Sequence, residues 1–468
     1  MITFHLNVNG KATIRHHDYM RFLGEKGFSM MEFPNGRKQL VRIINNIVES
    51  ATENDLVSCT KDYLIKAGEH DVLEVFIKGV NSFTTSKKLE FLPTIKSISD
   101  KDPKDTAWFY YKNTAVKITA GGIDIVAYSS LTHPIWKNRI LERSFIMPNS
   151  SQGQFFKFIS LISKEDLDRY LALQTAMGYL LHRYNDPSLP KAIILLDEKI
   201  SFDGTANGGT GKGVLALALG HCKNLEVIDG QQLKSDSRFK NQRIDVTTDI
   251  LLFDDVSKKF TLDDIKSMIT SGITVEKKGK DEVHIPAKDA PKIMISSNYI
   301  VGGTGGSTDL RRRYEFEVPD YFSNTYTPIN EFGNLFFDEW DENEWSMFDL
   351  LMMECVQQFL QCSLLEPSKI NLTNNKLMCT TNPEFKLFSS ENIVVDTWHD
   401  KDLLFSKFKS ENLVYAGITS HQFTKWVKEY AKIHELTYDS KSPGGVQQFI
   451  LRSNLNLVKD EEQDTLSL

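Results

Sequence analysis

The sequence contains no apolar run of about 18 residues, which is the length that a membrane-spanning helix requires. Its five cysteines are scattered, with no CxxC pair and no Cys/His set at zinc spacing, a pattern typical of reduced thiols. The stretch "MITFHLNVNGK" at its start has no apolar core of signal-peptide length. We therefore expect a protein without a membrane partner, in the cytoplasm or, if a virus or mobile element encodes it, in the host cell cytoplasm.

An excess of positive charge is also absent. The 62 acidic residues outnumber the 55 Lys and Arg residues, giving a formal net charge of −7. This balance argues against a protein that coats nucleic acid nonspecifically, although it allows a local basic channel. At 468 residues the chain is long enough for roughly two to four domains.

Apolar runs flanked by loops predict a parallel α/β sheet in the middle of the chain. "AIILL", residues 192–196, has the continuous apolar character of a strand that is buried on both faces. A Gly-rich loop and the helical stretch "VLALALG" follow it, and "DILLFDDV" and "APKIMISSN" predict further buried strands. Strands that alternate with helices indicate a parallel sheet.

The Gly-rich loop reads "ANGGTGKG" over residues 206–213. Successive glycines let backbone N–H groups converge on phosphate oxygens at the start of a helix, and Lys212 is placed to reach the β- and γ-phosphates. The pattern G-x-x-x-x-G-K-[ST] is incomplete, because Ala206 replaces the first Gly and Gly213 replaces the Ser or Thr that ligates Mg²⁺; a water can fill that position. The candidate cofactor-binding residues are Asn207, Gly208, Gly209, Thr210, Gly211, Lys212 and Gly213.

Polar residues at the ends of the next two apolar runs complete a possible phosphoryl-transfer site. Asp254 and Asp255 end "ILLFDDV", where carboxylates can hold Mg²⁺ through water and polarise the attacking water. Asn298 ends "IMISSN", where an amide can orient that water or sense the γ-phosphate. Arg311, Arg312 and Arg313 follow a second Gly-rich loop, and such a cluster can supply a guanidinium to the triphosphate of a neighbouring subunit.

Between these runs, "ITVEKKGKDEVHI" predicts a hairpin with Lys277, Lys278 and Lys280 at or near its tip. Cations on a projecting hairpin can grip the phosphates of single-stranded DNA. The alternative interpretation is a solvated cluster of charge.

The ordered set "GGTGKG", "ILLFDDV", "VEKKGK", "KIMISSN" and "DLRRRYEFEV" resembles the superfamily 3 helicases of the AAA+ class. The resemblance spans about 150–325 and is strongest to the ATPase part of phage, plasmid and large-virus primase-helicases. It implies a hexameric ring that hydrolyses ATP with Mg²⁺ between subunits and moves 3′-to-5′ on single-stranded DNA. It also implies Lys212 as the Walker A lysine, Asp254 as the Mg²⁺-associated acid, Asp255 as the acid that acts on water, Asn298 as sensor 1, and Arg312 or Arg313 as the arginine finger.

The C-terminal part predicts an amphipathic helix followed by a strand. In "SHQFTKWVKEYAKIHE" five apolar residues recur at helical spacing, while Lys425, Lys428 and Lys432 lie together on the other face. With the strand "QQFILRS" after "SPGG", this is similar to the winged-helix domain of such replication proteins. The basic face can contact a phosphate backbone, or the helix is an ordinary amphipathic surface helix.

Smaller signals give further expectations. Gly121-Gly122 indicates a hairpin turn, Ser163 with Asp166 indicates a helix-capping box, and "NLTNNKLMCTTNPE" is interpreted as a loop or linker.

We thus expect an α/β protein with an AAA+ P-loop core. The expected regions are an N-terminal α+β domain of unknown role (1–150), a helical collar (151–190), the superfamily 3 ATPase domain (191–325), a helical segment and linker (326–394) and a winged-helix-like domain with a charged tail (395–468). The expected function is an ATP-dependent DNA helicase in the replication of a phage, virus or mobile element, acting on single-stranded or forked DNA. We recognise no primase active site, so the protein would partner a primase on another chain or act at an origin itself. The alternatives are a replication initiator or loader that binds ATP and DNA without unwinding, and an AAA+ protein remodeller.

Overall fold

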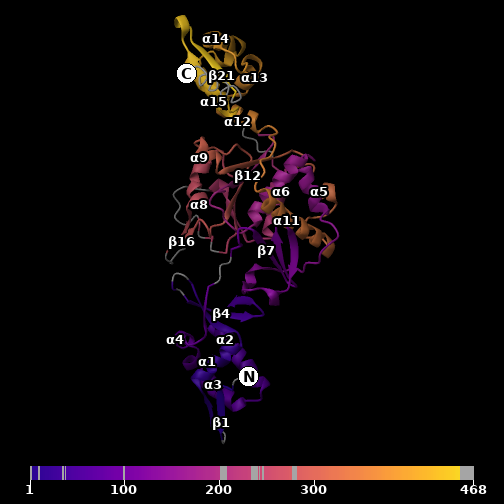
Figure 1. Cartoon of the computed structure of the whole chain (residues 1–468), viewed down its shortest axis with the longest axis vertical. Coiled ribbons are helices and arrows are strands. Elements are labelled where there is room, and N and C mark those ends of the chain that lie inside the picture. The colour runs from indigo at the N-terminus through magenta and orange to yellow at the C-terminus, as the bar shows by residue number, and fades with distance from the viewer. Residues whose placement is uncertain are drawn as a thin grey trace, which may run out of the picture.

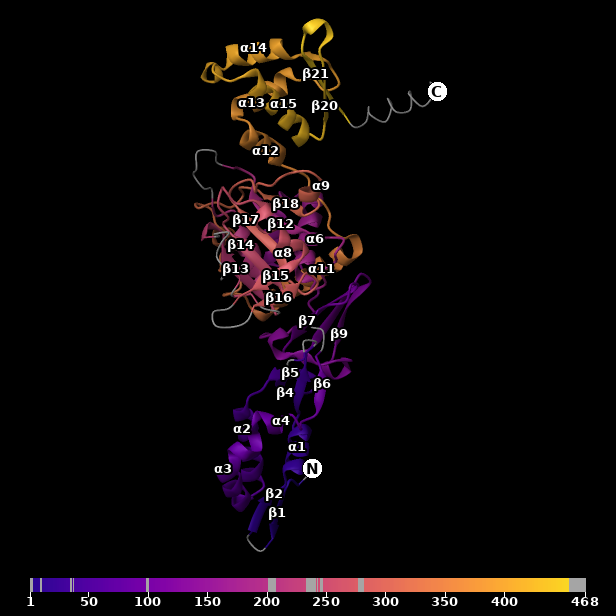
Figure 2. The same cartoon turned by 90° about the vertical axis from the view of Figure 1, so that its left-hand side faces the viewer.

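The computed structural model describes residues 3–8, 11–33, 36, 38–97, 101–200, 208–232, 241, 243–244, 247–276 and 282–453. The chain is elongated, with the N-terminal region at one end, a C-terminal group of helices and short strands at the other, and a body built on a parallel sheet between them (Figures 1 and 2). Asn207, Lys277, Lys278, Lys280 and the charged tail lie outside the described residues, so their expected roles stay predictions.

The N-terminal region is a five-stranded sheet with helices packed against it, and a separate hairpin of β1 and β2. The strand order is β10-β5-β4-β3-β6, in which β10 comes from later in the chain and pairs in parallel with β5. The elements are β1 (His5–Val8), β2 (Lys11–Ile14), α1 (His16–Glu25), β3 (Phe28–Glu32), β4 (Lys38–Ile44), β5 (Ile47–Ser50), α2 (Glu53–Lys66), α3 (His70–Thr84), α4 (Ser86–Leu89), β6 (Thr94–Lys96) and β10 (Ile135–Trp136).

A second sheet has the order β11-β7-β8-β9. Its strands are β7 (Thr106–Tyr111), β8 (Ala115–Thr119), β9 (Gly122–Val126) and β11 (Ile140–Leu141). The hairpin that Gly121-Gly122 predicted is the β8–β9 connection. Phe109, Val116 and Ile118 belong to the hydrophobic core of the central body. Residues 106–119 thus pack against the central body, whereas β10 pairs with β5 of the N-terminal sheet.

The central body contains a five-stranded sheet in the order β13-β14-β17-β12-β18, with all neighbours parallel. The strands are β12 (Ala192–Asp197), β13 (Leu225–Asp229), β14 (Ile250–Asp254), β17 (Lys292–Ser297) and β18 (Arg313–Val318). Every residue of β12 and β17 is buried, which accounts for the apolar runs "AIILL" and "IMI" within them. The parallel sheet expected from those runs is confirmed.

Helices and one hairpin complete the body. They are α5 (Gln154–Leu161), α6 (Leu167–Leu181), α7 (Lys212–Gly220), α8 (Lys266–Thr270), β15 (Gly272–Val275), β16 (Val283–Pro286), α9 (Ser307–Leu310), α10 (Pro328–Phe332) and α11 (Glu342–Cys362). Helices α6 and α11 cross closely: a Cβ on Gly178 would lie 2.0 Å from the carbonyl oxygen of Cys355, so only glycine fits there. β15 and β16 pair antiparallel as the base of the expected basic hairpin.

The C-terminal end consists of α12 (Leu372–Thr380), α13 (Pro383–Asn392), β19 (His399–Asp400), α14 (Lys401–Glu411), α15 (Ser420–Ile433), β20 (Thr437–Lys441) and β21 (Gln448–Arg452). The loop expected in "NLTNNKLMCTTNPE" is wrong, because that stretch contains α12. Tertiary contacts override its polar composition: Leu372 and Leu377 are buried, and the Asn375 side chain donates a hydrogen bond to the carbonyl oxygen of Glu198. Among the described residues, no helix is both long and apolar enough to span a bilayer.

Candidate functional site

The Gly-rich loop joins β12 to α7 at the carboxyl edge of the parallel sheet. Gly209 and Gly211 have φ angles of 93° and 107°, in the left-handed region that favours glycine. A Cβ on Gly211 would also lie 2.9 Å from the Phe158 ring, so this position has two reasons to be glycine. Helix α7 begins at Lys212 directly after the loop. Because the first N–H groups of a helix have no carbonyl partners within it, the start of α7 can bind a phosphate.

Lys212 is mostly buried and is held by three side chains. Its Nζ forms an ion pair with Asp197, donates to Asn298 Oδ1 at 3.0 Å and lies 3.5 Å from Thr210 Oγ1. Burial lowers the pKa of Lys212 below its ordinary value, and the Asp197 carboxylate opposes that shift. The Lys212 ammonium is thus fixed between the end of β12 and the end of β17.

The two acids follow at the end of β14, next to β17. Asp254 accepts a hydrogen bond from the Ser296 hydroxyl at 2.5 Å. Asp255, which has a left-handed φ of 47°, accepts from the Asn298 side-chain amide at 2.8 Å. Because β17 lies between β12 and β14, Asn298 bridges Lys212 on one side and Asp255 on the other. The structure brings together the lysine, the amide and the acids that the sequence singled out.

A cleft of about 810 Å³ opens beside these groups. Its walls are the loop from Gly208 to Gly213, the exposed face of α7, the ends of β14 and β17, and Thr327 with Pro328. A volume of several hundred Å³ with apolar walls and a few convergent polar groups is typical of a small-molecule site. The segment after β18 also reaches the loop, since a Cβ on Gly209 would lie 3.0 Å from Asn324 Oδ1.

These residues fit a triphosphate better than a metal held by protein alone. Among the described residues, no group of three or more His, Cys, Asp or Glu side chains could hold a metal ion. Asp254 and Asp255 can instead complete the water shell of an Mg²⁺ ion that arrives on phosphate oxygens, which is how Mg²⁺ usually binds beside nucleotides. Gly213 supplies no hydroxyl, and a Cβ at this position would meet nothing within 4 Å.

The arginine cluster lies at the opposite edge of the sheet. In the β12–β18 register, Arg313 pairs with Ala192, the first residue of β12, whereas Asp197 is its last. Five residues of strand span about 17 Å, so this edge is beyond the reach of the chain's own Lys212 site. Any action of these arginines on a triphosphate would require a second molecule.

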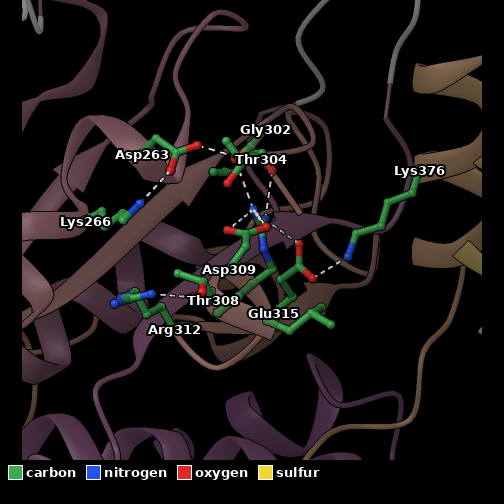
Figure 3. A network of polar contacts seen from close by, with 12 residues as sticks. Asp263, Lys266, Gly302, Thr304, Thr308, Asp309, Arg312, Glu315 and Lys376 are labelled. Atoms are coloured by element: carbon green, nitrogen blue, oxygen red, sulfur yellow. Dashed lines mark hydrogen bonds and ion pairs between the residues drawn. The ribbon is translucent and has the colours of Figure 1, made fainter. Parts of the chain in front are cut away.

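Within this cluster the three arginines differ. The buried Arg313 guanidinium donates to the carbonyl oxygens of Val301 and Gly302 and pairs with Asp309 and Glu315, at the centre of the network that continues to Lys376 (Figure 3). Arg312 is also buried and donates to the Thr308 carbonyl oxygen at 2.5 Å. Arg311 is exposed, and with Arg312 it lines a cavity of about 390 Å³ beside the base of the β15–β16 hairpin.

The three lysines of α15 are exposed on the face opposite its buried one. Lys428 Nζ lies 5.0 Å from the centroid of the Tyr438 ring. Lys432 faces the central body instead, since a Cβ on Gly305 would lie 2.6 Å from its Nζ. Of the three, Lys425 and Lys428 therefore remain the better placed for an external partner.

Sequence reasoning missed Asp197. The signal was the pair of carboxylates, Asp197 and Glu198, that follows the apolar run "AIILL" before the loop segment that carries Lys212. The structure places the Asp197 side chain against that lysine.

Residues 205–313 match a family of unknown function (DUF5906), a stretch that contains the Gly-rich loop, both acids and Asn298. No curated protein matches the sequence. Among solved structures, two A-form apo structures of the NrS-1 C-terminal region are similar, each with 14% identity over 92% of this chain and 98% of that chain, at TM-scores of 0.39 and 0.42.

Proposed function

We propose that this chain is an ATP-dependent DNA helicase or translocase of the superfamily 3 type, which hydrolyses ATP with Mg²⁺ between the subunits of a ring during replication of a phage, virus or mobile element. The observation that carries the proposal is the continuous contact from Lys212 through Asn298 to Asp255. A cation for the phosphates, an amide and an acid for the attacking water are the groups that phosphoryl transfer to water requires.

The rest of the body supports a shared site. Because Arg311 is exposed and precedes β18 at the edge of the sheet opposite the loop, it suits a guanidinium supplied to the next subunit better than Arg312 or Arg313, which are buried in contacts within the chain. The β15–β16 hairpin starts from the same edge, since β17 follows it directly. Such a hairpin can carry its lysines toward DNA in the middle of a ring.

Lys212→Ala tests the proposal. We expect ATPase activity that single-stranded DNA stimulates in the unchanged protein, and a loss of roughly 100-fold or more in the variant, because a preorganised charge at the transferring phosphoryl group is lost. Phosphate release with and without DNA is the measurement. Lys199→Ala is the matched control, since Lys199 is exposed and pairs with Asp320; it should keep full activity.

Lys212→Ala also leaves Asp197 buried without its partner, which is strongly destabilising. The double variant Lys212→Ala/Asp197→Asn removes that strain, and we expect it to fold normally and remain inactive. Wild-type protein without ATPase activity, or a folded Lys212 variant with undiminished activity, would contradict the proposal.

One observation favours a second candidate, a replication initiator or loader that binds ATP and DNA without unwinding. Gly213 lacks the hydroxyl that would ligate Mg²⁺, which weakens the case for rapid hydrolysis. A strand-displacement assay on forked DNA separates the two functions, because a loader binds the fork and leaves it paired.

A further inference from the structure

Asp197 occupies an unusual position for a carboxylate. It is the last residue of β12, it is 2% exposed, and its Oδ1 atom accepts hydrogen bonds from both Lys212 Nζ and Thr210 Oγ1, the latter at 2.7 Å. Its other oxygen, Oδ2, is buried and has no hydrogen-bond partner among the described residues. A buried carboxylate with half of its acceptors unused is costly to maintain.

The Lys212–Asp197 pair competes with the binding of a triphosphate. The Lys212 ammonium, which would meet the β- and γ-phosphates, already has a full negative charge beside it on the side away from Asp254 and Asp255. The Asp197 carboxylate competes with the phosphates for the Lys212 ammonium and repels them, because charges interact more strongly in a partly buried site than in water.

The geometry also allows the exchange. An ammonium has three donors, so Lys212 can keep its bond to Asn298 while it turns one N–H from Asp197 to a phosphate oxygen. Thr210 continues to donate to Asp197 after the exchange.

We propose that Asp197 is an internal counter-ion that holds Lys212 until a triphosphate takes over the lysine. Asp197 thereby sets the nucleotide affinity of the loop. The inference rests on the proposed function, because it assigns a competing partner to the same lysine. Asp197 is a positioning and affinity-setting residue in this scheme and takes no part in the chemistry.

Asp197→Asn tests this role, because the substitution keeps the shape and the acceptor for Thr210 while it removes the charge. We expect the Kd for ATP and for ADP, each with Mg²⁺, to fall about tenfold or more, equivalent to about 1.4 kcal/mol. Adenosine, which carries no phosphate, should bind equally to both proteins. Isothermal titration calorimetry measures all three ligands.

Glu198→Gln is the matched control. Glu198 is the next residue and is also buried, but its side chain contacts Lys164 and Asn371 instead of Lys212. Loss of this neighbouring charge should change the Kd for ATP less than about twofold, whereas a general effect of negative charge near the loop would change it as much as Asp197→Asn does. Asp197→Glu, which keeps the charge, should bind ATP no more tightly than wild type.

The outcomes separate the inference from the proposed function. If wild type binds ATP and Asp197→Asn binds it equally or more weakly, Asp197 merely positions Lys212 and the inference is wrong while the proposed function stands. If Asp197→Asn binds ATP where wild type does not, the counter-ion role is supported. If neither protein binds ATP, both ideas fail. Asp197→Ser, which also removes the charge, replaces Asp197→Asn if the latter does not fold.

Discussion

Gly213 lacks the hydroxyl that would ligate Mg²⁺, so restoring a side chain at this position tests how strongly the site binds the ion. Gly213 lies in the first turn of α7, and a Cβ there would meet nothing within 4 Å. We expect Gly213→Ser to lower the Mg²⁺ concentration for half-maximal ATPase activity about fivefold, because one added oxygen ligand contributes about 1 kcal/mol. The measurement is ATPase rate against Mg²⁺ concentration at saturating ATP.

Gly213→Ala separates the two effects that Gly213→Ser has, one on the stability of the helix and one on Mg²⁺ binding. Either residue stabilises a helix by up to about 1 kcal/mol relative to glycine, but only serine supplies a hydroxyl. If the alanine variant shows the same gain, helix stability and not Mg²⁺ coordination is responsible, and the reading of Gly213 as a missing ligand is wrong.

At the scale of single residues, the sequence predicts side chains whose place follows from strand order. Asp254, Asp255 and Asn298 each end an apolar run, and parallel strands bring such ends to one edge. Asp197 met the same criterion, but a carboxylate before the loop belongs to no motif, and the contact of Asp197 with Lys212 depends on the path of the loop. Likewise, three adjacent arginines look equivalent in sequence, and only tertiary contacts show that Arg313 is enclosed by Asp309 and Glu315.

At the scale of elements, helix α6 starts three residues later than the capping signal at Ser163 indicated. Lys164 and Glu165 have left-handed φ angles of 59° and 55°, which break the helix, and Asp166 caps the first turn by accepting from the Arg169 N–H. Apolar periodicity fixes the buried face of a helix, whereas its exact start depends on single backbone conformations that composition does not determine.

The other end of α6 makes a prediction about pH. His182 is buried at that end, and its Nε2 lies 2.9 Å from the Pro103 carbonyl oxygen and 3.2 Å from that of Thr106, so Nε2 carries a proton and donates. Burial and, to a smaller extent, the charge of Lys292 lower the pKa of His182 to about 4, while Asp102 opposes both. The neutral imidazole therefore ties the start of β7 to α6.

Because this pKa is about 6.5 in the unfolded chain and about 4 in the folded one, the unfolded chain binds more protons between those values. The stabilisation is complete above pH 6.5 and is lost as pH falls toward 4. We expect wild type to lose on the order of 2 kcal/mol more unfolding free energy between pH 7 and 4.5 than His182→Gln, whose amide can still donate. Urea unfolding at each pH measures it; parallel losses in the two proteins would contradict the assignment.

At the scale of the whole molecule, the sheet separates two halves of one proposed site. Lys212 lies at the carboxyl edge, and Arg311 lies before the first residue of β18 at the other. In a ring of the proposed kind, each chain would present the two halves to different neighbours. Interfaces of this head-to-tail kind close into rings when the rotation between subunits permits.

Mixing two inactive variants tests this division. We expect Arg311→Ala and Lys212→Ala each to lack DNA-stimulated ATPase activity. An equimolar mixture of the two should regain about a quarter of wild-type activity. When subunits take random places in a head-to-tail ring, one junction in four joins an intact Lys212 to an intact Arg311. Phosphate release after co-assembly is the measurement. Arg313→Ala is the contrasting variant: it leaves Asp309 and Glu315 without their buried partner, so it should unfold at lower denaturant concentration, whereas Arg311→Ala should unfold as wild type does. If the mixture stays inactive while both variants assemble, the site that hydrolyses the triphosphate is formed within one chain, and the arginines at the far edge have another role.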